Sequence, residues 1–262
     1  YPFSQVEIES QFNIERALKF GMLPQVWNLK GDEEAKKDYL SAYVDTYLKE
    51  EVQQEAAVRS LPSYLKFLEH FALRNGQVIN LQNLAGEIGV PRTTLHGYLD
   101  ILEQTLLGAR LAPLHLQAKV KEVSNPKFYF FDIGVVRALA KQLDDDLGAE
   151  KGELLETLVL HEIKLYSDYF SQRWEVNYWG TPSKNEVDFV ISKGKKRIGI
   201  EVKAAKKWKK EFNSGLDVLL DNNKIASAYG VYLGSEILKS GKVTVLPFHL
   251  FVSQMQSGKI KI

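Results

Sequence analysis

The sequence predicts a mixed α/β protein, and two patterns of apolar residues predict it. Up to about residue 110, apolar residues recur at threes and fours, which is the period of amphipathic helices. From residue 151 onward, one helical stretch is followed by short runs in which apolar and polar residues alternate, which is typical of strands. Of the 262 residues, 45% are apolar and 26% are charged, so the chain can form two or three separate cores.

We expect three domains along the chain. Residues 1–60 form a helical connector, residues 61–118 a winged helix-turn-helix, and residues 119–262 a mixed-sheet domain. The boundaries follow the changes of pattern, from long helical periods to a short helix-turn-helix rhythm and then to alternating strands.

The helical connector begins with a short helix over residues 13–20, which Gly21 ends and Pro24 keeps from resuming. A long helix follows over residues 33–58, where apolar side chains recur at threes and fours. Pro62 then opens the first helix of the next domain, since proline is tolerated in the first turn of a helix.

Residues 78–114 have the rhythm of a helix-turn-helix, with a tight break at residues 89–91 between two helices and strand material after them for a wing. The second helix buries Leu95, Tyr98 and Leu99. On its exposed face we expect nucleic-acid contacts from Arg92, Thr93, Thr94 and His96. This face has few basic residues, so a winged helix that docks a protein or acts as a spacer is the alternative.

The C-terminal part alternates between helices and strands. We expect helices over residues 153–170 and within 209–223, and strands over 174–180, 185–194, 196–203, 227–234 and 242–251.

Two charged strands joined by a short turn, "NEVDFVISKGKKRIGIEVK", carry the main functional signal. Strand alternation places Asp188 with Val190 on one face and Val187 on the other, and it places Glu201 and Lys203 together on the next strand. The short turn makes the strands an antiparallel pair, so Asp188 lies beside Glu201. A solvated, charged hairpin is the alternative interpretation.

Two adjacent carboxylates repel each other unless a cation lies between them, and a hard divalent cation prefers oxygen ligands. We therefore expect Mg²⁺ or Mn²⁺ at Asp188 and Glu201. Glu156, on the helix before the strands, is the third expected ligand, with Glu153 and Glu162 as nearby competitors.

This order of a helical Glu, a strand Asp and then Glu-x-Lys resembles the restriction-endonuclease-like superfamily, the PD-(D/E)xK nucleases. The resemblance implies metal-assisted hydrolysis of a phosphodiester, with Glu156, Asp188, Glu201 and Lys203 as catalytic residues. The three carboxylates would hold the metal, and Lys203 would position the attacking water and offset phosphate charge. Many members keep the fold and lose the chemistry, so a non-catalytic module that binds nucleic acid or protein is the alternative.

A basic tract, "KAAKKWKK", follows the second charged strand. Lys206 and Lys207 are candidates for holding a nucleic-acid backbone, and Trp208 for stacking on a base. A solvated loop is the alternative.

Several classes of protein are excluded or disfavoured by composition. The absence of cysteine excludes disulfides and thiolate zinc sites and favours the cytoplasm. No apolar run reaches the length of a membrane span, so we expect no membrane partner. The net charge of +1 shows no overall preference for polyanions. No Walker A loop is present, so this chain cannot bind ATP through such a loop of its own.

Read in order, phrases such as "YPFS", "LAGEIGVPRTTLHGYLDILEQTLL", "PKFYFFDIGVVRAL", "NEVDFVI" and "IEVK" resemble the C-terminal region of a bacterial and archaeal family of AAA-type ATPases. The resemblance implies that the chain is part of a longer protein, in which an N-terminal ATPase module binds ATP and is a partner of this region. Nucleic acid is the other expected partner, and the sequence allows a homo-oligomer. Lys49 stands where the family pattern has Arg, which questions any role of that position in binding ATP in trans.

Overall fold

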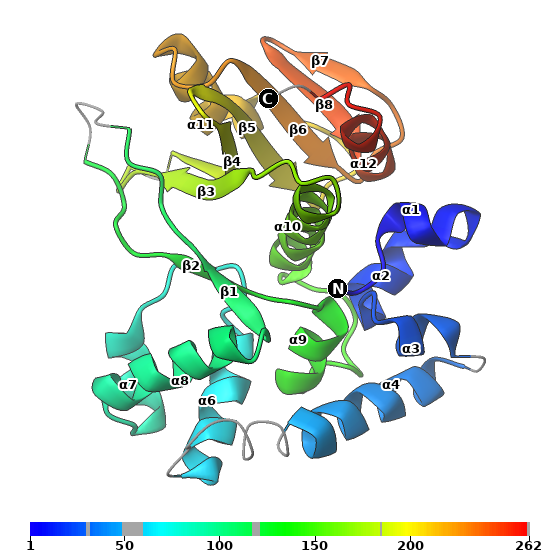
Figure 1. Ribbon diagram of the computed structural model, residues 1–262, viewed down its shortest axis with the longest axis vertical. Coiled ribbons are helices and arrows are strands. Elements are labelled where there is room, and N and C mark those ends of the chain that lie inside the picture. The colour runs from blue at the N-terminus through cyan, green and yellow to red at the C-terminus, as the bar shows by residue number, and fades with distance from the viewer. Residues whose placement is uncertain (30–31, 49–59, 117–120, 184, 261–262) are drawn as a thin grey trace. The chain divides into compact units, whose positions relative to one another are not determined.

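The computed structural model describes residues 1–29, 32–48, 60–116, 121–183 and 185–260 (Figure 1). It contains both helices and strands, with a mixed sheet of six strands and a separate pair of strands. The mixed α/β class that the sequence predicts is confirmed.

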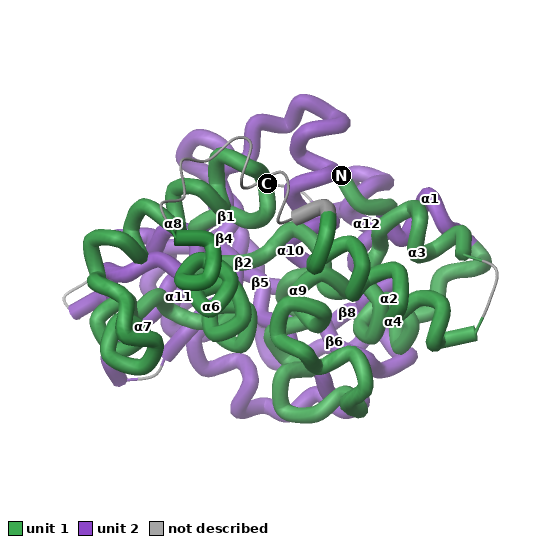
Figure 2. The backbone as a smooth tube through the Cα atoms, turned by 90° about the horizontal axis from the view of Figure 1, so that it is seen from below, with its two compact units in different colours: residues 1–3, 10–110, 128–157 green, residues 4–9, 111–127, 158–262 purple. Residues whose placement is uncertain are grey.

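The chain divides into two compact units, which Figure 2 shows in green and purple. Unit 1 comprises residues 1–3, 10–110 and 128–157, and unit 2 comprises residues 4–9, 111–127 and 158–262. Unit 2 thus takes a short segment near the N-terminus as well as the C-terminal part. The three predicted domains group the chain differently and stay a prediction.

Unit 1 is built mainly from helices. Its elements are η1 (Glu9–Gln11, shared with unit 2), α2 (Ile14–Phe20), α3 (Pro24–Asn28), α4 (Glu33–Ala42), the π-helical η2 (Tyr43–Leu48), α6 (Leu61–Ala72), α7 (Leu81–Ile88), α8 (Arg92–Gln104), most of the strand pair β1 (Gly108–Leu111) and β2 (Lys127–Phe130), α9 (Ile133–Leu139) and the start of α10 (Lys151–Tyr169).

The connector helices follow the predicted signals with one correction. Asn13 caps α2 by accepting a hydrogen bond from the N–H of Arg16 (2.9 Å), and Gly21 ends the helix with a φ of 74°. Pro24 does not keep a helix from resuming. It begins α3, because its fixed φ suits the first turn of a helix and its missing N–H is not needed there.

The predicted long helix over residues 33–58 begins at Glu33 as expected, with Asp32 accepting a hydrogen bond from the N–H of Ala35. After Ala42 the backbone becomes π-helical, which the side-chain pattern does not reveal. The rest of that prediction, including the position of Lys49, lies outside the described residues.

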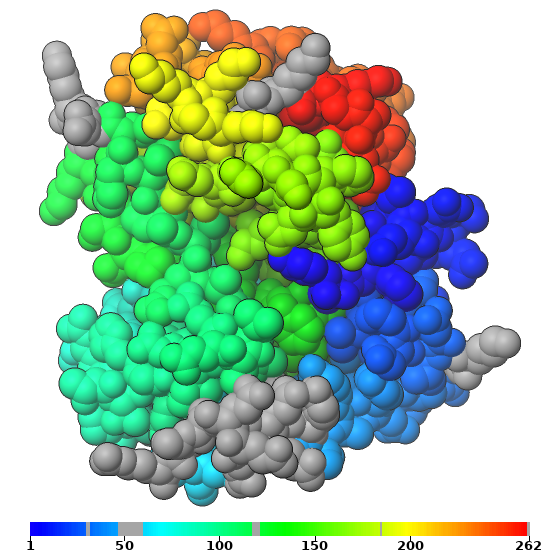
Figure 3. All heavy atoms as spheres, in the orientation of Figure 1, coloured from blue at the N-terminus to red at the C-terminus, as the bar shows by residue number. Residues whose placement is uncertain are grey.

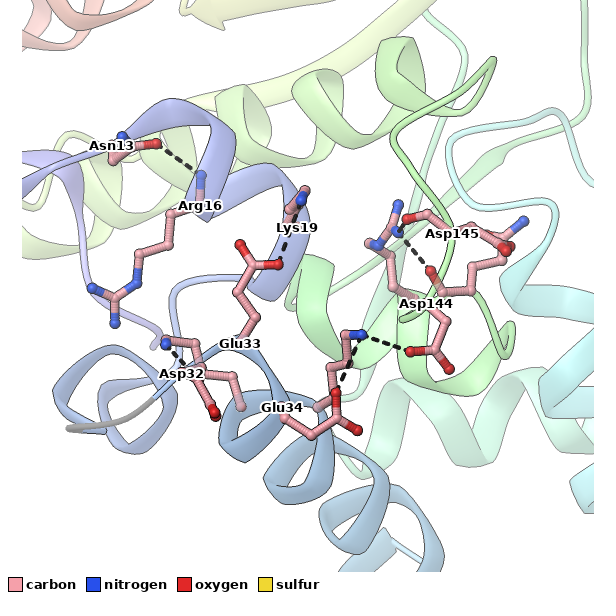
Figure 4. Close-up of polar contacts among 12 residues, drawn as sticks. Asn13, Arg16, Lys19, Asp32, Glu33, Glu34, Asp144 and Asp145 are labelled. Carbon is pink, nitrogen blue, oxygen red and sulfur yellow. Dashed lines mark hydrogen bonds and ion pairs between the residues drawn. The ribbon is translucent and has the colours of Figure 1, made fainter.

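Charged side chains connect the helices of unit 1, as Figure 4 shows. The ammonium of Lys19 lies 3.6 Å from a carboxylate oxygen of Glu33, and that of Lys37 lies 2.6 Å from Asp144 and 3.5 Å from Glu34. Because these carboxylates are exposed, water and salt screen the pairs, and each contributes little to stability.

The helices α6 and α8 share an aromatic core. The ring of Tyr98 lies 5.0 Å from that of Tyr64 and 5.4 Å from that of Phe67, between ring centroids. Leu95 and Leu99 are also buried, so α8 turns inward the face that the sequence predicts.

Unit 2 is a six-stranded mixed sheet with helices. Its elements are α1 (Gln5–Ile8), the rest of α10, β3 (Glu175–Gly180), β4 (Glu186–Lys193), β5 (Lys196–Lys203), η3 (Lys210–Asn213), α11 (Ser214–Asp221), β6 (Ser227–Tyr232), β7 (Leu238–Ser240), β8 (Val243–Pro247) and α12 (Phe248–Gln256). The strand order is β3-β4-β5-β6-β8-β7, with β5-β6 and β6-β8 parallel and the other neighbours antiparallel.

A shift of register in β4 changes the predicted alternation. Asn177 of β3 pairs with Val190 of β4, and Trp179 of β3 pairs with Val187 of β4. From one pair to the next, β3 moves by two residues and β4 by three. This extra residue in β4 indicates a β-bulge at the position of Asp188. Val187 therefore joins the same hydrophobic cluster as Val190. The prediction that these two valines lie on opposite faces is wrong, because the bulge adds one residue to the strand.

The end of the sheet contains a second correction. A strand is expected over residues 242–251, but β8 ends at Pro247 and α12 begins at Phe248. The apolar side chains of both elements are buried, and a continuous apolar run does not distinguish a buried strand from a buried helix.

The N-terminal segment of unit 2 is held by a buried carboxyl group. Ser4 and Glu7 form a capping box around α1, and the N–H of Gln5 donates to Oε1 of Glu162 (2.6 Å) on α10. Glu162 has no exposed surface. Among the described ranges, no helix has both the length and the apolar character needed to cross a bilayer.

Candidate functional site

Asp188, Glu201 and Lys203 meet at one end of the β4–β5 pair. The register in which Phe189 pairs with Ile200 places Asp188 across from Glu201. The Lys203 ammonium lies 2.5 Å from Oε1 of Glu201 and 3.9 Å from Oδ2 of Asp188. The predicted trio is therefore close together, with the ammonium between the two carboxylates.

The backbone fixes Asp188 further. Its Oδ2 accepts a hydrogen bond from the N–H of Val202 (2.7 Å), so the carboxylate satisfies a backbone group of the neighbouring strand. The side chains of Asp188 and Glu201 are 5% and 8% exposed, whereas that of Lys203 is 31% exposed. Of these three side chains, that of Lys203 is the most open to solvent.

Sequence analysis missed a second lysine, Lys127, at the start of β2. Its ammonium lies 4.0 Å from Oδ1 of Asp188 and forms an ion pair with Glu186, and its side chain is only 6% exposed. The signal was a single lysine at the head of the otherwise apolar run "KFYFF". Buried lysines occur mostly where they are paired, so this position indicated a carboxylate partner.

Tyr178 on β3 closes the cluster beside Lys127. The Lys127 ammonium lies 5.5 Å above the centre of its ring. Burial raises the pKa of the Tyr178 hydroxyl to about 12, an effect that the charge of Lys127 opposes. The hydroxyl remains neutral and donates to the carbonyl oxygen of Asn125.

The cluster combines three carboxylates, of Glu186, Asp188 and Glu201, with two ammonium groups. Two nearly buried carboxylates offer the oxygen ligands that Mg²⁺ and Mn²⁺ prefer. In the part of the chain that the structure describes, no group of three or more acidic, His or Cys side chains is arranged to share one metal ion. A metal bound here would have water or substrate oxygens as its remaining ligands.

Glu156, the third predicted ligand, belongs to unit 1, where the hydroxyl of Tyr129 donates to its Oε2 (2.7 Å). Its competitor Glu162 is fully buried and is bonded to Gln5, so it is not available to a ligand from solvent. The role of Glu156 as a ligand and catalytic residue stays a prediction.

The basic tract after β5 is split between surface and core. Lys206 and Lys207 are exposed. Trp208 is half-buried: its indole N–H donates to Asn213 (2.9 Å), and its ring lies 5.4 Å from that of Phe212. These contacts hold the Trp208 side chain in the fold. Its stacking on a base stays a prediction, as does the binding of phosphate groups by the two exposed lysines.

The predicted nucleic-acid face of α8 is exposed at Arg92, Thr93, Thr94 and His96. Its electrostatics are weak, because Asp100 and Glu103 bind Arg110 nearby (2.9 Å from Asp100). Residues 61–110 carry four Lys or Arg and four Asp or Glu. With no net charge, this part of the chain has no general attraction for a phosphate backbone.

The overall net charge of +1 conceals a division between the two units. Unit 2 carries 20 Lys or Arg and 13 Asp or Glu, a net charge of +7, whereas unit 1 carries 14 and 20, a net charge of −6. A polyanion would therefore be attracted to unit 2 and repelled by unit 1.

Two family models match the chain. Residues 11–146 match one described as a domain of unknown function (DUF8612), and residues 151–251 match another described as a domain of unknown function (DUF4143). The junction between the two matches falls in the acidic segment that ends before α10.

Curated relatives are distant and longer. An uncharacterized protein of Methanocaldococcus jannaschii is 24% identical over 92% of this chain and 49% of its own length. Uncharacterized proteins of Mycobacterium tuberculosis and Haemophilus influenzae are each 24% identical over 70% of this chain, and over 41% and 44% of their own lengths. The chain spans about half, or less, of the length of these relatives.

Proposed function

The chain belongs to the family described as a domain of unknown function (DUF8612), and we propose that its unit 2 is a nuclease-like domain. In this proposal the cluster of Asp188, Glu201 and Lys203 binds a phosphodiester of DNA and hydrolyses it with a divalent cation. The proposal also takes the whole region as DNA-associated, with unit 2 making the main contact.

One observation supports this proposal most strongly. The ammonium of Lys203 lies between two carboxylates at the adjoining ends of paired strands, 2.5 Å from Glu201 and 3.9 Å from Asp188. This is the arrangement that the Asp and Glu-x-Lys pattern requires. A solvated hairpin would leave such side chains exposed, but both carboxylates are nearly buried.

The donors suit Mg²⁺ or Mn²⁺, which when bound would polarise the phosphate and activate water. Asp188 and Glu201 are the residues that would hold the ion, with Glu156 as the predicted third. Lys203 would release Glu201 and bind a phosphate oxygen, which its partial exposure and flexible side chain allow. Lys127 would remain beside Asp188 and balance its charge.

A non-catalytic module is the second candidate, and Lys127 favours it. Two ammonium groups already lie beside Asp188 and Glu201, so part of the carboxylate charge is balanced without a metal ion. In this case the same cluster would only stabilise the sheet, and unit 2 would bind nucleic acid or protein without cutting it.

Cleavage assays separate the two candidates. The purified chain is incubated with plasmid and single-stranded DNA and with Mg²⁺ or Mn²⁺, beside Asp188→Ala and Lys203→Ala. We expect metal-dependent cutting by the wild type and a loss of about 100-fold or more in each variant. Lys239→Gln, at an exposed lysine on β7, is the matched control and retains activity. Cutting that persists in both variants sinks the nuclease proposal.

We further propose that this chain acts together with an AAA-type ATPase module. Two observations support this proposal. The sequence resembles the C-terminal region of such ATPases, and the curated relatives are about twice as long as the part of them that matches this chain. ATP would then be bound by that module, and its turnover would control the access of unit 2 to DNA.

A further inference from the structure

A second surface of unit 2 lies at the other end of the β4–β5 pair. Lys193 and Lys196 face each other beside the turn that joins these strands, five residues along from Asp188 and Glu201. At about 3.3 Å per residue, this end is roughly 16 Å away from the carboxylate cluster. The two sites are therefore separate.

Exposed aromatic side chains occur there, at the C-terminal end of α10. Tyr169 is 58% exposed and Phe170 is 54% exposed. The rings of Phe170 and Trp174 lie 4.7 Å and 5.1 Å from that of Tyr166, between centroids. One side of the Phe170 ring is thus supported by the fold while much of its surface faces solvent.

Basic side chains occur in the segment after α10 and in the turn between β4 and β5, which a hydrogen bond joins. Arg173, Lys193, Lys195 and Lys196 are all exposed. The Lys193 ammonium donates to the side-chain oxygen of Gln172 (3.0 Å), which joins the turn between the strands to the segment after α10. Asp168 and Glu175 are the exposed acidic residues of this neighbourhood, so positive charge prevails.

The backbone of this segment is sharply turned. Ser171 and Arg173 have φ values of 49° and 54°, in the left-handed region that non-glycine residues seldom adopt. Hydrogen bonds from the N–H of Gln172 to Ser167 (2.8 Å) and from the N–H of Trp174 to the Ser167 hydroxyl (3.1 Å) stabilise the turn. Yellow-green and yellow parts of the chain, which include this region, face the viewer in Figure 3.

We propose that this surface binds single-stranded nucleic acid. We define the hairpin surface as Tyr169, Phe170, Arg173, Lys193, Lys195 and Lys196. The exposed rings offer flat faces on which unpaired bases can stack, whereas the bases of a duplex are already stacked inside it. The positive charges of the lysines and Arg173 complement the negative charge of the phosphate backbone. The proposal rests on the proposed function only in taking nucleic acid as the ligand of unit 2.

The test is the affinity of the whole chain for a fluorescent oligothymidine of about 20 nucleotides, measured by anisotropy without divalent metal at several salt concentrations. The variants are Lys195→Gln/Lys196→Gln and Phe170→Leu, which keeps an apolar side chain but removes the ring. The matched control is Lys239→Gln/Lys242→Gln, at exposed lysines elsewhere in unit 2.

We expect the double lysine variant to raise Kd about tenfold and to reduce the slope of log K against log salt by about 1.4, since each phosphate contact on a single strand contributes about 0.7. Phe170→Leu raises Kd about fivefold or more. The control leaves Kd unchanged. The assay contains no divalent metal and measures binding without cleavage, so a failed nuclease proposal does not remove this result.

Three results would overturn the inference. These are equal affinity of the wild type and both hairpin variants, tighter binding of a duplex than of the single strand, and binding of vesicles containing anionic phospholipid without any binding of the oligonucleotide. The last result would identify the exposed rings and lysines as a membrane-contacting surface.

Discussion

Glu162 lies in the middle of α10 with no exposed surface, and burial raises the pKa of its carboxyl group to about 8. The hydrogen bond from the N–H of Gln5 opposes this rise, and the charge of Glu7 adds to it. The group is therefore mostly protonated near neutral pH. In this form it holds α1 against α10 without a buried charge.

This residue predicts a pH dependence of stability. The folded pKa of about 8 lies above the ordinary value of 4.5, so the contribution of Glu162 is complete below about pH 4.5 and is lost as the pH rises to 8. Over that range we expect the free energy of unfolding to fall by a few kcal/mol from this group. Denaturant titrations at several pH values measure it, with Glu162→Gln as the variant that cannot ionise. If the free energy of unfolding of Glu162→Gln falls as steeply with pH as that of the wild type, this account is contradicted.

At the residue scale, the sequence indicates most of the candidate site. Asp188, Glu201 and Lys203 could be predicted because their spacing on paired strands determines which side chains meet. Lys127 could not be assigned to the site, because it comes from a strand sixty-one residues before Asp188. No local pattern connects such distant positions, although a lysine in an apolar run signals a buried partner.

Among the elements, α11 and β4 approach each other closely at a glycine of α11. A Cβ added at Gly215 would lie 1.9 Å from the carbonyl oxygen of Glu186. A larger residue at Gly215 would push α11 away from β4 at Glu186, two residues before Asp188. The approach of α11 therefore contributes to the position of the candidate site.

The expected effect of Gly215→Ala is destabilisation by about 1 to 3 kcal/mol, because overpacking outweighs the roughly 1 kcal/mol by which alanine favours a helix. Gly97→Ala in α8 is the matched control, since a Cβ there meets no atom within 4 Å. That variant is expected to gain up to about 1 kcal/mol. Chemical denaturation measures both, and equal effects of the two substitutions would refute the argument.

Most elements could be predicted from periodicity, since α7, α8 and β3 to β6 lie within the expected ranges and α10 begins two residues before its expected range. The errors occur where local signals are ambiguous. A proline suits both the end of one helix and the start of the next, as at Pro24. The change from β8 to α12 falls within a buried apolar run, and the bulge at Asp188 arises from pairing with β3.

For the molecule as a whole, the distribution of charge is more informative than its sum. The sequence alone gives a net charge of +1, but this sum combines +7 in unit 2 with −6 in unit 1. The division could not be read from the sequence, because unit 2 includes segments from three separate parts of the chain. A polyanion is therefore expected to be attracted to unit 2 and not to unit 1, which contains α8.

The central claim is that Asp188 and Glu201 form a divalent-metal site, and thermal unfolding of the whole chain tests it most directly. At Mn²⁺ concentrations of about ten times its Kd, binding contributes about 1.4 kcal/mol, which raises Tm by roughly 3 to 6 °C. We predict this rise for the wild type and its loss in Asp188→Asn, compared with each protein in a metal chelator. No rise in the wild type, or an equal rise in the variant, would contradict the claim.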